Sequence, residues 1–158
     1  MGEAQVGRIL GIDAGERRIG VAISDPGRSF ALPLDSILAD GSEFDRLAEL
    51  AAREGVSDLV VGLPLSLSGE ASAQTERARA FASKAEQRLE LAVHMWDERL
   101  SSREAERLVA PEREGRGRDR NRRGGGRGGR PSTGADTDAL AASIILQAYL
   151  DSLRYANP

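Results

Sequence analysis

The chain has 158 residues, 40% of them hydrophobic and 30% charged, with a net charge of −3. This length fits one domain with one core, residues 1–158, and no apolar run approaches the roughly 20 residues of a membrane span. The absence of cysteine and the single histidine, His94, exclude a disulfide framework, a thiolate metal site and a multi-histidine zinc site. Any metal would be bound by oxygen, which favours Mg²⁺ or Mn²⁺. The first seven residues lack a signal-peptide pattern, so we expect a cytoplasmic protein.

Three strands are predicted at the start of the chain. They cover residues 8–13, 19–24 and 29–36, and all are rich in β-branched or apolar residues. The first connection is the tight turn Glu16-Arg17-Arg18 between Gly15 and Gly20, and the second is Asp25-Pro26-Gly27. Because both connections are short, the three strands should form an antiparallel meander.

The hydrophobic period then changes from that of strands to that of helices. Phe44, Leu47, Ala48 and Ala51 are spaced as one face of a helix, which predicts a helix over 42–54 ending at Gly55. The elements predicted after it are a buried strand at 59–61, a helix over about 72–88 and a fifth strand at 91–96.

The last third of the chain separates two predicted helices by a long irregular segment. Ser101-x-x-Glu104 has the form of a capping box, which predicts a helix starting near residue 102 and ending before Pro111. Residues 111–135 have no periodicity, and residues 136–155 form a largely apolar final helix. The order βββαβαβα predicts an α/β fold with a mixed five-stranded sheet flanked by helices.

The net charge hides a strongly basic segment. Between Pro111 and Pro131 eight arginines stand against three acids, so this segment carries +5 and the rest of the chain −8. Its Arg and Gly composition predicts a flexible loop that binds phosphate backbones with little sequence preference, and a merely solvated loop is the alternative. The arginines that we expect to contact nucleic acid there are Arg116, Arg118, Arg120, Arg122, Arg123 and Arg127.

Three carboxylates stand at the ends of predicted elements. Asp13 ends the first strand, Glu98 follows the fifth strand, and Asp138 lies in the first turn of the final helix. If the two strands run parallel, their carboxyl ends share one edge of the sheet, where α/β folds place their ligands. Three such acids could bridge two Mg²⁺ or Mn²⁺ ions and support phosphodiester hydrolysis, with one ion activating water. We therefore predict a metal-dependent nuclease site.

Each acid also has a structural explanation. Asp13 could stabilise a turn, Glu98 could pair with Arg99 or Arg103, and Asp138 could be favoured by the helix dipole alone. Crowded carboxylates repel one another, so stability alone would not gather all three.

Several neighbours of these acids have secondary roles in the interpretation. Asp97 and Asp136 are reserve candidates for the site. His94 and Trp96 lie within the fifth predicted strand and are expected to be structural. Arg17, Arg18 and Arg99 lie near the predicted site and are candidates for phosphate contacts or for surface ion pairs.

Four motifs in order resemble the YqgF family of RNase H-like nucleases, also called RuvX-like Holliday-junction resolvases. The motifs are Leu10-Gly11-Ile12-Asp13-Ala14-Gly15 with Arg18 to Ala22, Val61-Gly62-Leu63-Pro64, Asp97-Glu98-Arg99-Leu100-Ser101-Ser102, and Asp138-Ala139-Leu140-Ala141-Ala142. The resemblance implies an RNase H-like fold, and it implies that Asp13, Glu98 and Asp138 are catalytic acids that bind metal. The fourth strand ends without an acid, so Glu98 should supply one from the fifth strand.

The resemblance also implies a substrate. The usual assignment of this family is processing of the 5′ end of pre-16S rRNA in ribosome biogenesis, and an older assignment is resolution of four-way DNA junctions. The partner is then structured RNA or branched DNA, with no membrane, and the protein is a monomer or a homodimer. A non-catalytic RNA-binding assembly factor is an alternative of another class. The loop Gly11 to Gly15 also resembles the phosphate loop of the actin-like and sugar-kinase superfamily, which binds ATP. That reading is disfavoured, because those proteins need two such domains and 158 residues leave no room for the second.

Overall fold

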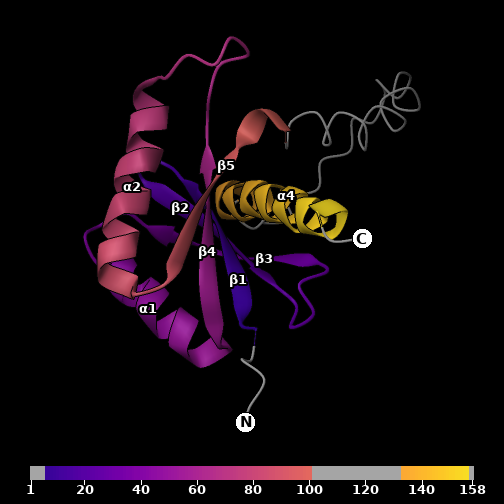
Figure 1. The fold of residues 1–158 in the computed structure, drawn as a ribbon. Helices are drawn as coiled ribbons and strands as arrows, with labels where there is room; N and C mark the ends of the chain where they lie inside the picture. The colour runs from indigo at the N-terminus through magenta and orange to yellow at the C-terminus, as the bar shows by residue number, and fades with distance from the viewer. Residues whose placement is uncertain (1–5, 101–132, 157–158) are drawn as a thin grey trace, which may run out of the picture.

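The computed structural model describes residues 6–100 and 133–156 of the chain (Figure 1). The predicted helix near residue 102 and almost all of the Arg/Gly segment 111–135 therefore lie outside the described residues. Of the helices that are described, none combines the length and the apolar character needed to cross a membrane.

The first three strands form the predicted antiparallel meander. They are β1 (Arg8–Ala14), β2 (Arg18–Ser24) and β3 (Ala31–Leu38). In the β1–β2 ladder Ile12 faces Val21 and Asp13 faces Gly20, so the last residues of β1 lie beside the first residues of β2. The interiors of β1 and β2 are buried, as expected for central strands.

Two further strands extend the sheet on the other side of β1. They are β4 (Val56–Leu63) and β5 (Ala92–Asp97), and the sheet order is β3-β2-β1-β4-β5. Both of the new pairings, β1 with β4 and β4 with β5, are parallel. The predicted mixed five-stranded sheet is confirmed, and the carboxyl ends of β1, β4 and β5 lie at one edge.

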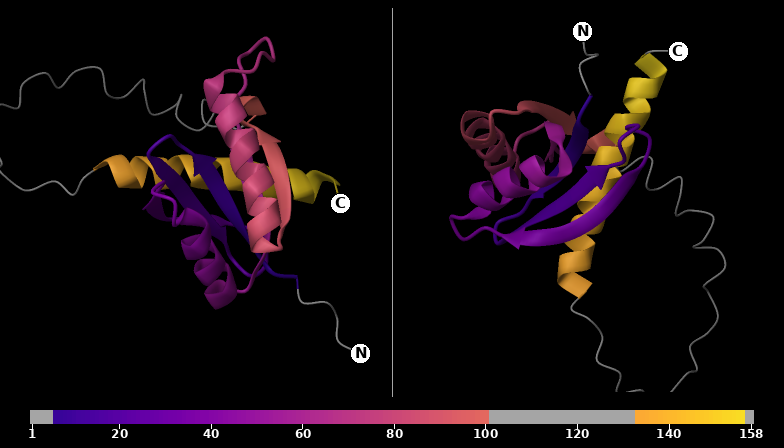
Figure 2. Two further views of the ribbon diagram at one scale, coloured as in Figure 1. Left: turned by 90° about the vertical axis from the view of Figure 1, so that its left-hand side faces the viewer. Right: turned by 90° about the horizontal axis from the view of Figure 1, so that it is seen from below.

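Helices cover both faces of the sheet. Helices α1 (Glu43–Glu54) and α2 (Ala73–Leu89) lie on one face and α4 (Thr133–Ala156) lies across the other, which makes three layers (Figure 2). Each face has its own core, one around residues such as Leu47 and Phe81, the other around Leu146 and Leu150. The prediction that the final helix packs on the sheet is confirmed.

The ends of α1 and α2 follow from local chemistry. Helix α1 ends at Gly55, whose φ of 66° is left-handed, as the sequence predicts. Helix α2 begins after Ser72, and Ser72 and Thr75 form a reciprocal capping box.

Two strands, β3 and β4, differ from their predicted bounds by two residues or more, and the other three by one. Strand β3 is shifted by two residues toward the C-terminus relative to the prediction. It starts later because the Asp25 carboxylate accepts hydrogen bonds from the amides of Ser29 and Phe30 and keeps these residues in the turn. Strand β4 is longer than the predicted 59–61, because its parallel pairing with β1 and β5 extends to Val56 and Leu63.

One predicted helix start is wrong, and another, near residue 102, lies outside the described residues. Residues 98–100, which directly follow β5, are helical, and the Asp97 carboxylate accepts a hydrogen bond from the Arg99 amide at 3.0 Å and caps this turn. Helix α4 begins at Thr133, three residues before the predicted start, so Asp138 lies in the second turn and not in the first. The helix dipole, which acts over the first turn, therefore does not explain Asp138.

Candidate active site

The three predicted acids come from β1, from the turn after β5 and from α4. Asp13 is the second-last residue of β1, and Glu98 directly follows the last residue of β5. Since β1 and β5 both run parallel to β4, these two acids leave the sheet at the same edge. Asp138 comes from α4, which crosses the face of β1 and β2. All three side chains are half-buried.

Gly20 lets the backbone of α4 approach the sheet at Asp138. Gly20 faces Asp13 across the β1–β2 ladder. A Cβ atom on Gly20 would collide with the carbonyl oxygen of Asp138, so only glycine permits this approach. The second turn of α4 thus lies directly on β1 and β2, beside Asp13.

A second glycine, Gly62, makes room for Glu98. Gly62 pairs with Trp96 in the β4–β5 ladder. A Cβ atom there would stand 2.5 Å from Glu98 Oε1 and 2.6 Å from Ile145 Cδ1, so the Glu98 carboxylate lies over the end of β4 beside α4. Glu98 therefore supplies, from the chain after β5, a carboxylate at the end of β4, which has no acid of its own.

Burial and like charge act on the same carboxyl groups. The pKa of Glu98 is raised to about 7, first by burial and then by the negative charges of Asp13 and Asp97. The pKa of Asp13 is also raised, by burial and by the charge of Asp138. Asp13 is thus electrostatically coupled to both of the other acids, and the site concentrates negative charge that a cation would offset.

The chemistry of these oxygen donors suits a hard divalent cation, but the three carboxylates do not enclose a common ion position. Among residues 6–100 and 133–156, no group of three or more Asp, Glu, His or Cys side chains is arranged to hold a metal ion. Like charge disfavours the close approach of carboxylates, and a bound cation would offset that charge.

Of the arginines predicted near the acids, Arg99 has defined partners. Its side chain forms an ion pair with Asp97, with Nη2 2.6 Å from Oδ2. Arg17 and Arg18 are exposed in the turn between β1 and β2. The predicted loop arginines, from Arg116 to Arg127, lie outside the described residues.

His94 and Trp96 have the structural surroundings that the sequence predicts. His94 Nε2 lies 2.9 Å from the Asp58 carboxylate, which also accepts a hydrogen bond from Arg28. The rings of His94 and Trp96 both contact Tyr149 of α4, at centroid distances of 5.6 and 5.9 Å. This cluster ties β4 and β5 to α4.

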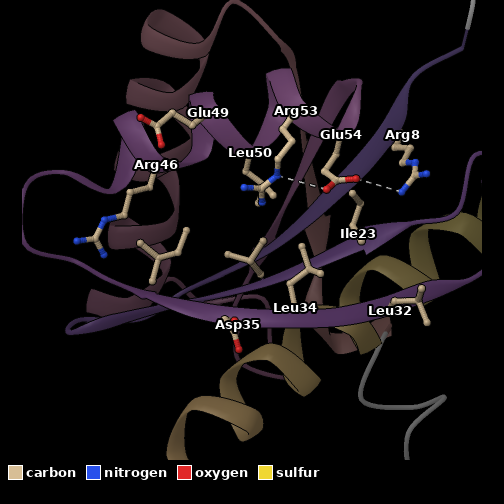
Figure 3. Close-up of a pocket in the computed structure, with 12 residues that line it drawn as sticks. Arg8, Ile23, Leu32, Leu34, Asp35, Arg46, Glu49, Leu50, Arg53 and Glu54 are labelled. Atoms are coloured by element: carbon tan, nitrogen blue, oxygen red, sulfur yellow. Dashed lines mark ion pairs between the residues drawn. The ribbon is translucent and has the colours of Figure 1, made fainter.

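A pocket of about 510 Å³ lies elsewhere, between α1 and strands β2 and β3 (Figure 3). Its floor is apolar, with Ile23 and Leu34 among the lining residues. At its rim Glu54 pairs with both Arg8 and Arg53, so the charges there are largely balanced. None of the three acids lines this pocket, so it is separate from the candidate active site.

Comparison with solved structures defines the class of this fold. Over 96% of this chain and 97% of the other, the structure resembles T. thermophilus RuvC in complex with a Holliday junction substrate, with a TM-score of 0.56 and 16% identity. A second structure of Thermus thermophilus RuvC gives a TM-score of 0.50. This is the RNase H-like fold that the sequence resemblance implies.

Sequence comparison then gives the family. Residues 7–152 match the family model of RuvX, described as a Holliday junction resolvase. Two relatives carry the name "Putative pre-16S rRNA nuclease": one from Chloroflexus aurantiacus, 42% identical over 95% of this chain and 90% of the relative, and one from Pelotomaculum thermopropionicum, 39% identical over 92% and 87%. The chain belongs to the RuvX family, a family of nucleases that hydrolyse phosphodiester bonds.

The sequence did not reveal which residues let the acids approach one another. Gly20 and Gly62 interrupt buried strands, which is the general signal of a close backbone approach, but the sequence does not say what approaches them. The cap formed by Asp97 was also missed, because the serines after it offered a stronger capping pattern.

Proposed function

We propose that this chain is a divalent-metal-dependent nuclease that processes the 5′ end of pre-16S rRNA in the cytoplasm. Asp13, Glu98 and Asp138 are its catalytic and metal-binding acids in this proposal. The observation that carries it is the approach of the three acids at one sheet edge, where Gly20 and Gly62 make room for them, and where burial and then like charge raise the pKa of Asp13 and Glu98.

The three acids would hold Mg²⁺ or Mn²⁺. When bound, such ions supply an activated water and stabilise the leaving oxygen of the cleaved bond. Asp13 and Asp138 are held by β1 and by the second turn of α4, and Glu98 lies between β4 and α4. Glu98 loses its proton at a higher pH than an ordinary glutamate. A bound cation would favour the ionised form of Glu98 and so lower its pKa.

Structured RNA is the proposed partner because of the relatives' name and because of the charge distribution. The Arg-rich segment that directly precedes α4 offers positive charge for phosphates, from Arg116, Arg118, Arg120, Arg122, Arg123 and Arg127, and Arg17 and Arg18 add to it beside β1. Aromatic residues make up only 4% of the chain, so recognition of the backbone and its shape fits better than reading of bases.

Resolution of a four-way DNA junction is the second candidate. The description of the matched family favours it. Symmetric cutting of a junction needs two active sites, so this function requires a homodimer, whereas rRNA processing is compatible with a monomer.

The test is a cleavage assay on two substrates with Mg²⁺ or Mn²⁺. A 5′-extended pre-16S rRNA fragment and a four-way DNA junction are incubated with the protein and with its Asp13→Asn variant as control. The proposal predicts Asp13-dependent cutting of the RNA. Cutting of the junction alone supports the resolvase, and RNA bound but not cut supports a non-catalytic assembly factor.

A further inference from the structure

Asp97 and Arg99, on either side of Glu98, form a fork of charged hydrogen bonds. Arg99 Nε lies 3.0 Å from each carboxylate oxygen of Asp97, and Nη2 lies 2.6 Å from Oδ2. The same carboxylate accepts the Arg99 amide at 3.0 Å. Side chain and backbone of Arg99 are therefore both tied to the last residue of β5, and Glu98 is held between two fixed neighbours.

Arg99 also reaches the loop that joins β4 to α2. Its remaining terminal nitrogen, Nη1, lies 3.4 Å from the carbonyl oxygen of Leu67, a long hydrogen bond. Nη1 also lies against Gly69, where an added Cβ would be 3.6 Å away. Since Leu63, the last residue of β4, pairs with Asp97, the loop and the Asp97–Arg99 pair start from adjacent points of the sheet edge.

The β4–α2 loop, residues 64–72, has a defined shape of its own. A turn joins Ser66 to Gly69, with the Gly69 amide 2.8 Å from the Ser66 carbonyl, and Leu65 pairs with Ala71. Gly69 has a φ of 87°, which favours glycine. The loop extends beyond the sheet at the edge where the Glu98 turn begins (Figure 1), and Leu67 at its tip is 89% exposed.

We propose that Asp97 and Arg99 are positioning residues whose ion pair fixes the β4–α2 loop relative to Glu98, so that a nucleic-acid strand meets the loop and the acids in one geometry. This inference rests on the proposed nuclease function. It assigns Arg99 a different role from a phosphate ligand, because Nε and Nη2 donate to Asp97 and Nη1 faces the loop.

Hydrogen exchange of the loop amides tests the clamp without any nuclease assay. The variants are Arg99→Lys, which keeps the charge but loses the fork, Arg99→Gln and Asp97→Asn, with Arg79→Gln in the exposed Arg79–Glu76 pair of α2 as control. The proposal predicts that exchange at Gly69 and Glu70 accelerates about tenfold in the first three variants and not in the control. Unchanged exchange would overturn it.

Cleavage kinetics then separate the two roles of Arg99. If Arg99 is a positioning residue, its variants should have a kcat reduced about tenfold or more and an unchanged KM. A double variant of Asp97 and Arg99 should then be no less active than either single variant. A raised KM, a salt slope reduced by about 0.7 and rescue by Arg99→Lys would instead make it a phosphate ligand and overturn the proposal. If the wild-type chain cleaves nothing, the proposed function fails, while hydrogen exchange still tests the clamp.

Discussion

Among the described residues, Glu98 has a carboxyl whose pKa is shifted far upward. Partial burial beside α4, followed by the negative charges of Asp13 and Asp97, raises the pKa of this carboxyl to about 7. An ionised carboxylate in these surroundings lowers the stability of the folded state, so the stability of the fold does not explain why a glutamate stands at this position. Such placement is typical of sites that bind a cation or move a proton.

The pH dependence of stability reports this environment directly. In metal-free buffer the folded protein keeps the Glu98 proton between the ordinary pKa of 4.5 and about 7, whereas the unfolded chain has released it. Because the folded state then binds more protons, stability falls as pH rises through this range. In thermal melts, the melting temperature of Glu98→Gln should fall less than that of the wild type as the pH rises from 4.5 to about 7. Above pH 7 the variant should have the higher melting temperature of the two. The exposed Glu86→Gln serves as control, and an equal fall in wild type and Glu98→Gln would refute the raised pKa.

The sequence already indicates the acids themselves. Asp13 ends a clear buried strand and Glu98 follows another, so their shared edge could be predicted once parallel pairing was assumed. Their close approach was not predictable, because it depends on the absence of side chains at Gly20 and Gly62. No local pattern says which helix will lie against a glycine in a strand.

At the scale of elements, the position of α4 decides the geometry of the site. Gly11 and Gly20 let this helix approach β1 and β2, since a Cβ on Gly11 would stand 2.6 Å from the Leu146 Cβ and one on Gly20 would meet the Asp138 backbone. Hydrophobic contacts below, with Leu146 and Leu150 buried, hold the helix there. The helix is therefore both half of the core and the carrier of Asp138.

Replacing Gly20 with alanine should move α4 away from the sheet at Asp138. We expect a loss of about 1–3 kcal/mol in the free energy of unfolding, as for other overpacked sites. The cleavage rate should fall by more than the loss of folded protein accounts for, because Asp138 moves relative to Asp13. Denaturant unfolding and cleavage rates measure the two effects, with Gly27→Ala in the β2–β3 turn as control. A Gly20→Ala variant as active as Gly27→Ala would show that the approach of α4 is unimportant.

The boundaries of elements were predicted less well than their existence. All five strands and the helices α1, α2 and α4 were predicted, because their hydrophobic periods are clear. The helical residues 98–100, which Asp97 caps, were not predicted. The start of α4 was placed three residues late, since Thr133, Gly134 and Ala135 give no strong helical signal.

At the scale of the whole molecule, positive charge is concentrated in one segment. Residues between Pro111 and Pro131 carry +5 while the rest of the chain carries −8. This segment lies outside the described residues, and its role as a nucleic-acid contact stays a prediction. The chain enters α4 directly after it, so it is tethered in sequence to the helix that carries Asp138.

Deleting residues 113–130 should weaken RNA binding and flatten its dependence on salt. Each lost phosphate contact lowers the slope of log K against log salt by about 0.7 for single strands. A variant in which the segment is replaced by a Gly/Ser linker of equal length separates charge from length and should behave like the deletion. Binding measured at several salt concentrations decides this, and an unaltered slope in both variants would contradict a role for the segment.

The most direct test of the central claim measures cleavage of the 5′-extended pre-16S rRNA fragment by three variants, Asp13→Asn, Glu98→Gln and Asp138→Asn. The exposed Asp40→Asn is the control, and circular dichroism verifies that each variant is folded. If the three acids form one site, each of the three loses on the order of a hundredfold or more in rate while the control stays active. Full activity in a folded variant of any of the three acids would contradict the account.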